Sequence, residues 1–254
     1  MDLPRPPSFR LDGKRALVTG GTRGIGLGAA VALAEAGAEV TIVSRTASDV
    51  AQAVAALKAA GLHATGATLD VTETAAVTEL VAAAEPFDIL VNSAGGARHS
   101  GFFEITEANY QAVLDLNLKS TLFVSQAVAA RLVAAGRPGS IIHISSQMGH
   151  VGGPRRAVYS ASKFAVEGLS KAMAIELGAH NIRVNTICPT FIETEMTART
   201  LAEPEFRTWV LSKIKLGRLG RVEDIMGPVV FLASDAAAMI TGSSLMVDGG
   251  WTAE

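Results

Sequence analysis

Strand-like and helix-like segments alternate along nearly the whole chain, and this alternation constrains the fold more than any other feature. The strand-like segments are short, apolar and rich in β-branched residues; they span residues 15–19, 39–44, 62–70, 87–92, 140–145, 182–187 and 244–248. The helix-like segments are longer and rich in alanine; they span residues 25–36, 49–60, 73–84, 109–118, 121–135, 158–177 and 222–233. The alternation predicts an α/β Rossmann-type fold: a doubly wound parallel sheet of about seven strands with helices on both faces.

The length of the chain suits one domain. Its 254 residues contain no internal repeat and no linker, so we predict a flexible N-terminal arm over residues 1–10 and a single domain over residues 11–254. Residues 190–221 interrupt the alternation, because they contain Pro204 and mix short helical patches with charge. A loop of this length in a compact domain is usually functional. We therefore expect a substrate lid there, with an ordinary surface excursion as the alternative.

Composition excludes several classes of protein. With 22 basic and 24 acidic residues the formal net charge is −2, which gives no electrostatic basis for binding nucleic acid or an anionic membrane. No uncharged apolar stretch reaches the ~18 residues of a membrane span, and the proline-rich N-terminus lacks the apolar core of a signal peptide. Cys188 is the single cysteine, so an internal disulfide is excluded. We expect a cytoplasmic protein without a bound metal, in which Cys188 is a small buried residue.

A glycine-rich loop, Thr19-Gly-Gly-Thr-Arg-Gly-Ile-Gly26, lies between the first predicted strand and the first predicted helix. Glycines allow a tight turn and a close approach of the backbone to phosphate, and the following helix offers free N–H groups and the positive end of its dipole. The loop therefore predicts the pyrophosphate site of a dinucleotide cofactor. Its candidate cofactor-binding residues are Gly20, Thr22, Arg23, Gly24, Ile25 and Gly26.

The end of the second predicted strand indicates which dinucleotide binds. An acidic residue there would bond the ribose 2′-hydroxyl of NAD, whereas a basic residue accommodates the 2′-phosphate of NADP. This chain has Ser44 and Arg45 at that point, and Arg23 in the glycine loop adds a second cation that could reach the same phosphate. These residues favour NADP(H). NAD(H) stays open as the alternative, because each arginine could instead be a solvated surface charge.

Tyr159 and Lys163 lie four residues apart, one turn apart on the same face of a predicted helix. A tyrosine with a reference pKa near ~10 exchanges protons poorly at neutral pH, and a neighbouring ammonium favours its ionised form. Ser146 lies upstream at the end of a predicted strand, with Ser145 as its rival. The Tyr–Lys pair alone is a weak signal, but beside a dinucleotide site it predicts a proton-transfer centre.

These motifs resemble those of the short-chain dehydrogenase/reductase family, in particular its 3-oxoacyl reductase and carbonyl reductase members. The similarity extends from about Leu11 to Trp251, and the family's other motifs occur in the expected order. Two positions depart from the family's pattern: Ser93 replaces an asparagine, and Thr190 replaces a glycine. The further cofactor-binding residues that the resemblance implies are Asp70, Val71, Asn92, Ala94, Gly95, Tyr159, Lys163, Pro189, Ile192 and Thr194.

The resemblance also implies a mechanism, namely hydride transfer between a nicotinamide and a carbonyl carbon. It makes Tyr159 the acid or base at the substrate oxygen and Ser146 a hydrogen-bonding partner of that oxygen. It makes Lys163 the group that lowers the pKa of Tyr159 and binds the nicotinamide ribose. It implies that Asn117 holds a water molecule that links Lys163 to solvent. The implied catalytic residues are thus Asn117, Ser146, Tyr159 and Lys163.

The residues that would select the substrate are less well defined. The candidates are Ser146, Gln147, His150, Tyr159 and Phe191. His143, within an apolar strand, is expected to be a packed core residue. The loop charges Arg98, His99, Arg155 and Arg156 could meet an acidic substrate, but we predict that they are solvated.

The leading interpretation is an NADP(H)-dependent oxidoreductase that acts on a small or medium ketone or secondary alcohol. Three alternatives stay open: an NAD-dependent sugar, polyol or other secondary-alcohol dehydrogenase; a 3-oxoacyl thioester reductase; and a non-catalytic dinucleotide-sensing regulator. The last should have lost the tyrosine or the lysine, and this chain keeps both. The resemblance further implies a homotetramer or homodimer.

Overall fold

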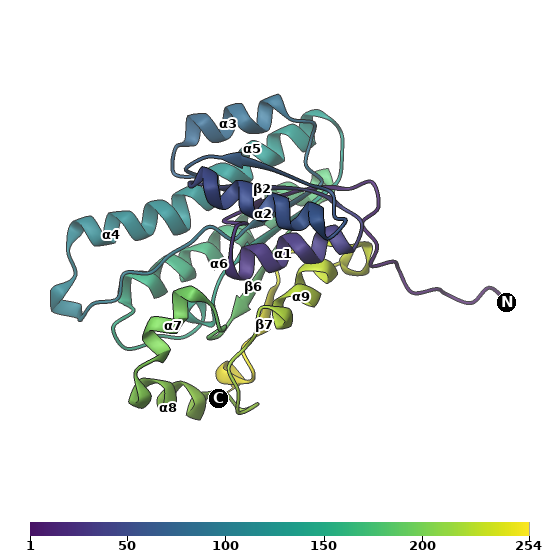
Figure 1. The fold of residues 1–254 in the computed structure, drawn as a ribbon. Coiled ribbons are helices and arrows are strands. Elements are labelled where there is room, and N and C mark those ends of the chain that lie inside the picture. Colours follow the sequence, from purple (N-terminus) through teal and green to yellow (C-terminus); the bar gives the residue numbers. More distant parts are fainter. Residues whose placement is uncertain (254) are drawn as a thin grey trace.

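Seven parallel strands form one sheet in the computed structural model, which describes residues 1–253 apart from the side chain of Arg199 (Figure 1). The strands are β1 (Arg15–Thr19), β2 (Glu39–Ser44), β3 (Ala64–Thr68), β4 (Ile89–Asn92), β5 (Gly139–Ile144), β6 (Ile182–Pro189) and β7 (Ser244–Val247). Their order across the sheet is β3-β2-β1-β4-β5-β6-β7. The predicted doubly wound parallel fold is confirmed.

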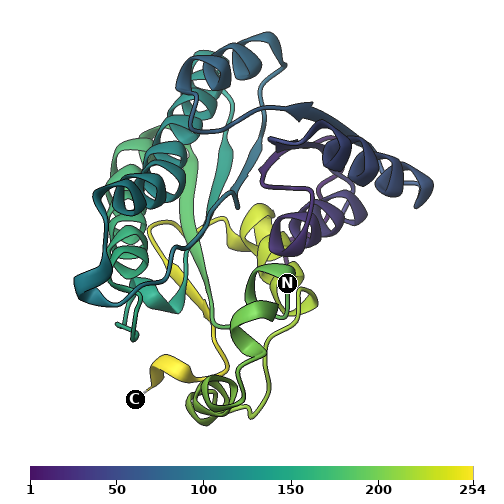
Figure 2. The same cartoon turned by 60° about the vertical axis from the view of Figure 1, so that its left-hand side comes forward.

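Helices cover both faces of this sheet (Figures 1 and 2). They are α1 (Gly24–Glu35), α2 (Ala47–Ala59), α3 (Thr74–Ala83), α4 (Glu107–Leu114), α5 (Ser120–Ala134), α6 (Ala157–Leu177), α7 (Glu195–Leu201), α8 (Pro204–Lys213) and α9 (Glu223–Ala233). Helices α1, α2 and α9 share one core, and α3, α5 and α6 share the other. In β1, Ala16 and Val18 belong to the first core and Leu17 to the second. A strand buried on both faces is apolar in its interior, as Ala16, Leu17 and Val18 are here.

The direction of winding reverses beside β1, which lies between β2 and β4. In open parallel sheets, ligands bind beyond the carboxyl ends of the strands at such a point. Thr19 and Asn92 end β1 and β4, pair in register and are both buried. The fold therefore brings the glycine-rich loop and the segment after β4 to the same edge of the sheet.

A π-helical turn, Asp115–Lys119, joins α4 to α5. The sequence predicts helices on both sides of this point but not the wide turn between them. Asn117 lies in the turn and is buried. Turns of this kind are frequent at functional sites because they change the direction of a side chain within a continuous helix.

The segment over residues 190–221 forms α7 and α8, which extend beyond the end of the sheet (green in Figure 2). A third hydrophobic core joins this segment to the rest of the molecule through Met148, Phe191, Val210 and Trp251. The short helical patches in the sequence are thus two helices, and the predicted role as a lid stays a prediction.

The predicted N-terminal arm lies outside the helices and strands of the domain. Residues 1–10 are exposed, form neither helix nor strand and extend away from the sheet (purple in Figure 1). Their predicted flexibility stays a prediction, and Glu254 lies outside the described residues. Within the described part of the chain, no helix combines the length and the apolarity that a membrane span needs.

Candidate active site

The glycine-rich loop between β1 and α1 has the geometry of a phosphate-binding turn. Gly20 and Gly24 have φ angles of 65° and 52°, which residues with a side chain rarely adopt. A Cβ atom on Gly26 would lie 2.1 Å from the carbonyl oxygen of Gly20. The first turn of α1 carries no side-chain cap and no acidic residue. Its N–H groups and the positive end of its dipole therefore fit the pyrophosphate of a dinucleotide.

Two arginines lie at the edge of the loop, where the sequence predicts the 2′-phosphate of NADP. Arg45 follows β2, and its Nη1 lies 3.8 Å from Oδ2 of Asp70. Arg23 precedes α1, and its Nη1 lies 3.7 Å from Oε2 of Glu195 in α7. The two arginine side chains are 65% and 71% exposed. Exposed pairs at this distance are weak, so either guanidinium can turn to a phosphate.

The segment after β4 connects the glycine-rich loop to the predicted catalytic groups. The backbone N–H groups of Ser93 and of the following residue donate to Oγ1 of Thr19 over 3.1 and 3.2 Å. These bonds use the backbone, so they do not depend on the asparagine that Ser93 replaces. A Cβ atom on Gly95 would lie 3.3 Å from Oδ1 of Asn117 and 3.8 Å from Nζ of Lys163. The predicted cofactor edge and catalytic groups are therefore neighbours.

The segment after β6 returns to the glycine-rich loop from the other side. Pro189 ends β6, and the N–H of Thr190 donates to the carbonyl oxygen of Val247 over 3.2 Å. This bond extends the pairing of β6 with β7 through the position where Thr190 replaces a glycine. The methyl group of Thr194 lies 3.4 Å from the position of a Cβ atom on Gly24. The predicted nicotinamide-binding segment and the predicted phosphate-binding loop thus face each other.

His143 in β5 is a packed core residue, as the sequence predicts. Its Nδ1 lies 2.8 Å from Oγ of Ser170, and its Nε2 lies 3.2 Å from Oγ of Ser125. The Ser170 hydroxyl already donates to the carbonyl oxygen of Val166, so Nδ1 carries the proton and Nε2 accepts from Ser125. Ser125 in turn accepts from Nδ2 of Asn92. Burial lowers the pKa of His143 to about 4, so a neutral imidazole orients the end of β4.

The neutral, buried His143 predicts a loss of stability in acid. Its pKa in the folded chain, about 4, lies below the ordinary value of 6.5. Between these values the unfolded chain binds a proton that the folded chain does not. The free energy of unfolding therefore falls with falling pH, by up to about 1.4 kcal/mol per unit. Urea unfolding from about pH 7 to about pH 4.5 should show a shallower decline for His143→Gln than for the unsubstituted protein.

A matched control for this experiment is His63→Gln, because His63 is exposed. This control should follow the unsubstituted protein at every pH. If the pH dependence of His143→Gln were equally steep, another group would account for the loss of stability in acid.

Ser146, Tyr159 and Lys163 come together at the carboxyl end of β5. The Ser146 hydroxyl interacts with the phenol of Tyr159, whose pKa it lowers, and donates to Oε1 of Gln147 over 2.8 Å. Nζ of Lys163 donates to the carbonyl oxygen of Ile144 over 2.8 Å and lies 5.8 Å from the centroid of the Tyr159 ring. The predicted substrate residue Gln147 is buried beside Ser146.

The alternative serine, Ser145, has a different environment. Its backbone N–H donates to the carbonyl oxygen of Ile187 over 2.8 Å. Its hydroxyl lies next to Gly149 and the side chain of Glu167. Since Ser146 is the serine that interacts with the phenol of Tyr159, the structure favours Ser146 over its rival.

Burial dominates the electrostatics of the tyrosine–lysine pair. It raises the pKa of Tyr159, against the opposing effects of the Ser146 hydrogen bond and the charge of Arg156. It also lowers the pKa of Lys163 to about 8, against the opposing effects of Cys188 and Glu167. The expectation that Lys163 holds the pKa of Tyr159 low therefore differs from what the structure shows. The buried phenol is protonated at neutral pH because desolvation disfavours its charged form.

Asn117 links three parts of the site. Its Oδ1 accepts from the N–H of Gly96 over 2.8 Å, and its Nδ2 donates to the carbonyl oxygen of Gly96 over 2.9 Å and to Oγ of Ser162 over 3.0 Å. Ser162 donates to the carbonyl oxygen of Tyr159 over 2.7 Å. Asn117 thus connects the π-helical turn to the segment after β4 and to α6. Its predicted role in holding a water molecule stays a prediction.

His150, Glu167 and Cys188 form a hydrogen-bonded group next to Lys163. Nε2 of His150 lies 3.6 Å from Oε2 of Glu167 and 3.5 Å from Sγ of Cys188. The ligand atoms of these three residues lie within 4.8 Å of one another, close enough to hold a metal ion. However, Thr186 and Ser244 already donate to Glu167 over 3.0 and 2.6 Å. Burial raises the pKa of Cys188 to about 12, so hydrogen bonds between a thiol and a carboxylate account for the group.

The two predictions about this group have different outcomes. Cys188 is fully buried, as predicted. The ring nitrogen of His150 is engaged with Glu167 and Cys188 rather than with the catalytic hydroxyls. The predicted contact of His150 with substrate stays a prediction that this orientation does not favour.

A group of aromatic side chains adjoins Tyr159. It packs against a cation, Arg156, whose burial the sequence did not predict. Phe191 is buried and stacks on Trp251, with ring centroids 5.8 Å apart. Arg156 is only 7% exposed, so the expectation that it is a solvated loop charge is wrong. It is buried because the rings of Phe191 and Phe206, distant in sequence, pack against it.

The ring of His99 was also missed as a neighbour of the site. It meets Tyr159 edge-on with centroids 6.3 Å apart. Its pKa is lowered to about 4, chiefly by burial and then by the charges of Arg156 and Arg155. Its position in the loop after β4 was the only signal in the sequence. His99 and Arg155 are both exposed, as predicted.

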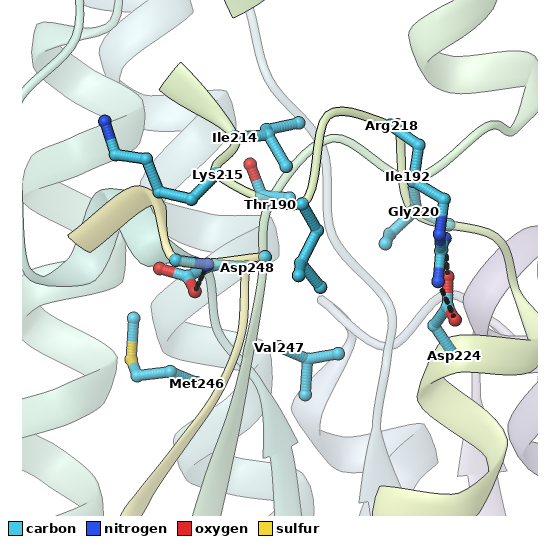
Figure 3. Close-up of a pocket in the computed structure, with 13 residues that line it drawn as sticks. Thr190, Ile192, Ile214, Lys215, Arg218, Gly220, Asp224, Met246, Val247 and Asp248 are labelled. Carbon is cyan, nitrogen blue, oxygen red and sulfur yellow. Dashed lines mark hydrogen bonds and ion pairs between the residues drawn. The ribbon is translucent and has the colours of Figure 1, made fainter. Parts of the chain in front are cut away.

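A cavity of about 480 Å³ lies where β6 and β7 end (Figure 3). Thr190 and Ile192 line it together with Asp248 and the ion pair between Arg218 and Asp224, whose atoms approach to 2.6 Å. The cavity shares Thr190 and Ile192 with the predicted nicotinamide-binding segment but contains none of the predicted catalytic residues. The candidate active site is therefore the hydrogen-bonded group around Tyr159, and the cavity adjoins it.

Comparisons with known proteins find similarity along nearly the whole chain. A family model described as enoyl-(acyl carrier protein) reductase matches residues 20–252. D-erythrulose reductase of Gallus gallus is 42% identical over 96% of this chain and 98% of that protein. Gluconate 5-dehydrogenase of Gluconobacter oxydans is 41% identical over 98% of this chain and 99% of that protein. The crystal structure of a gluconate 5-dehydrogenase from Burkholderia cenocepacia with NADP and tartrate is 37% identical, has a TM-score of 0.94, and aligns over 97% of this chain and 98% of that one.

Proposed function

Because the chain belongs to the short-chain dehydrogenase/reductase family and is an NAD(P)-dependent oxidoreductase that acts on CH–OH groups, we propose that it interconverts a secondary alcohol and a ketone in a small sugar or polyol with NADP(H). One observation carries the proposal. The phenol of Tyr159 interacts with the Ser146 hydroxyl, with Lys163 one turn further along α6. This group lies at the edge of the sheet where the glycine-rich loop begins α1.

The residues around Tyr159 would manage the proton of the reaction. A bound nicotinamide supplies the hydride for reduction and accepts it in oxidation. Tyr159 donates its phenolic proton to the substrate oxygen as that oxygen gains charge, and takes the alcohol proton in the reverse direction. Ser146 hydrogen-bonds the same oxygen, which fixes its position and stabilises the developing charge. Asn117 would hold the water through which Lys163 exchanges protons with solvent.

The cofactor would be held by the strand ends already described. The N-terminus of α1 at Gly24, Ile25 and Gly26 fits the pyrophosphate. Lys163 uses one of its three donors on Ile144, and the others are available for the nicotinamide ribose. The remaining residues that we assign to cofactor binding are Gly20, Thr22, Arg23, Ser44, Arg45, Asp70, Val71, Asn92, Ala94, Gly95, Pro189, Ile192 and Thr194.

The names of the relatives support a polyhydroxylated substrate. D-erythrulose is a neutral ketose and gluconate is a sugar acid, so the relatives leave open whether the substrate is charged. The test is to mix the purified protein with NADPH or NADP⁺ and matched panels of ketoses, keto acids, alditols and aldonates. Turnover, followed by nicotinamide absorbance, is expected for at least one alcohol–ketone pair. No turnover with either the phosphorylated or the unphosphorylated cofactor would contradict the proposal.

The choice of cofactor depends on Arg45. Its guanidinium is exposed and only weakly paired with Asp70, so it is free to bind the 2′-phosphate that NADPH has and NADH lacks. We expect Arg45→Gln to raise the Kd of NADPH about 10-fold, as the loss of one charge-assisted bond requires, and to leave that of NADH nearly unchanged. Fluorescence titration measures both constants. Arg10→Gln, which removes another exposed arginine, is the control. Equal losses for both cofactors would contradict this role.

Two further features of the molecule are part of the proposal. We assign residues 190–221 a role as a substrate lid, because Phe206 in α8 contacts Arg156 beside Tyr159. We also propose a homotetramer or homodimer, because Phe123 in α5 and Phe164 in α6 are 36% and 50% exposed. Light scattering at working concentration would report the assembly, and a monomer would contradict it.

A further inference from the structure

Arg156 is a buried cation without an acidic partner among the described side chains. It directly precedes α6, three residues before Tyr159, and is 7% exposed. Its Cζ lies 5.2 Å from the centroid of the Phe191 ring and 5.2 Å from that of Phe206. Its one hydrogen bond to a described residue runs from Nη1 to the carbonyl oxygen of Pro154 over 3.3 Å. No carboxylate among the described side chains lies within ion-pair distance of it.

A buried charge of this kind requires a physical reason. Removing a guanidinium from water is costly unless it is paired or hydrogen-bonded. The two aromatic rings offset part of that cost through cation–π contact. Both rings lie within cation–π distance of the guanidinium carbon. Four of the five N–H donors have no partner among the described residues, and two parallel donors of a guanidinium match the two oxygens of a carboxylate.

The position of Arg156 relates it to the substrate rather than to the cofactor. Its charge acts on the phenol of Tyr159 and on the ring of His99, and these two rings meet edge-on. The low pKa of His99 keeps that imidazole neutral at neutral pH, so Arg156 is the buried positive charge on this side of Tyr159. The arginines suited to the cofactor phosphate, Arg23 and Arg45, lie instead at the ends of β1 and β2.

We propose that Arg156 binds a carboxylate of the substrate, so that the enzyme acts on a polyhydroxy acid or keto acid in preference to the matching neutral polyol or ketose. The inference rests on the proposed function and names its substrate class. The reacting carbon lies at Tyr159 and Ser146, and the carboxylate lies at the aromatic group formed by Phe191 and Phe206. The negative charge completes an ion pair that the described part of the chain leaves open.

The test compares substrates that differ only in charge, such as D-gluconate and D-glucitol with NADP⁺, within panels of four to six carbons. We expect the unsubstituted enzyme to prefer the acids in kcat/KM. Arg156→Gln should lower kcat/KM for the acids at least ~10-fold, mainly through KM, and change that of the neutral compounds less than ~3-fold. Arg156→Lys keeps the charge but loses the planar set of N–H donors. Its kcat/KM for the acids should lie between those of the unsubstituted enzyme and Arg156→Gln. The neighbouring exposed arginine provides the control Arg155→Gln, which should behave as the unsubstituted enzyme.

A binding experiment separates this inference from the proposed function. Calorimetric titration of D-gluconate into Tyr159→Phe with NADPH bound measures affinity without turnover. The heat of binding should be present in this variant and absent when Arg156→Gln is added. Thermal unfolding of every variant identifies any that fails to fold, in which case Arg156→Lys decides.

Each outcome has a definite meaning. A preference for neutral compounds, equal losses for both panels in Arg156→Gln, or no binding of any acid would overturn the carboxylate site and leave the proposed oxidoreductase intact. Failure of every compound to turn over would instead overturn the proposed function. Binding of an acid that depends on Arg156 would even then support the carboxylate site.

Discussion

Tyr159→Phe should lower kcat by about 10²–10⁴-fold, the range that a positioned general acid contributes, while the Kd of NADPH changes less than ~3-fold. The substitution removes one oxygen and keeps the ring. It therefore removes the proton donor at the reacting oxygen but preserves the packing of the ring against His99 and the third hydrophobic core. No second group replaces it: the Ser146 hydroxyl already donates to Gln147, and a serine is a far weaker acid than a phenol.

The chain supplies a matched control for this substitution. Tyr110 is the only other tyrosine, and it is 45% exposed on α4. Tyr110→Phe removes the same oxygen far from the hydrogen-bonded group and should leave kcat unchanged. If Tyr159→Phe kept the turnover of the unsubstituted enzyme, the assignment of Tyr159 as acid and base would be wrong.

The raised pKa of Tyr159 also predicts how the reduction and oxidation rates depend on pH. Burial raises the pKa of the phenol, so the protonated form, which reduction needs, persists through the neutral range. The reduction rate should therefore hold from neutral to mildly alkaline pH, whereas the oxidation rate should rise with pH because it needs the phenolate. Initial rates in both directions across this range would measure the difference.

The fold was predictable because its signals are local. The central strands contain short apolar runs, and a strand buried on both faces requires such a run whatever its neighbours are. The glycine-rich loop was predictable for the same reason, since glycine adopts the positive φ angles of Gly20 and Gly24 far more readily than residues with a side chain do. The sequence predicted one site for Ser146, Tyr159 and Lys163 because parallel strands end at the same edge of the sheet.

The surroundings of the site were not predictable because they depend on contacts between distant residues. Arg156 is a charged residue in a polar loop, and only the rings of Phe191 and Phe206 make it a buried one. The orientation of His150 depends on Glu167 in α6 and Cys188 in β6. The raised pKa of Tyr159 depends on burial, which no spacing of residues reports. The π-helical turn at Asn117 carries no breaker residue that would mark it in the sequence.

Gly26→Ala should raise the Kd of NADPH at least ~100-fold and lower the free energy of unfolding by about 1–3 kcal/mol or more, as overpacking against fixed atoms does. The added Cβ atom would lie 2.1 Å from the carbonyl oxygen and 2.8 Å from the carbonyl carbon of Gly20. These atoms belong to the backbone, so no side chain can rotate to relieve the contact. The N–H of Gly20 is also fixed, because it donates to the carbonyl oxygen of Val43 over 2.8 Å.

The loop can then accept the methyl group only by moving away from α1, which separates the N–H groups that fit the pyrophosphate. This is why binding should suffer more than folding. The control is Gly227→Ala in α9, where a Cβ atom would meet nothing within 4 Å. Alanine in an exposed helix should stabilise it by about 0.5–1 kcal/mol. Fluorescence titration and urea unfolding measure the two effects separately. If Gly26→Ala bound NADPH as tightly as Gly227→Ala does, the loop between β1 and α1 would not be the phosphate site, because its tight closure is what gives that site its shape.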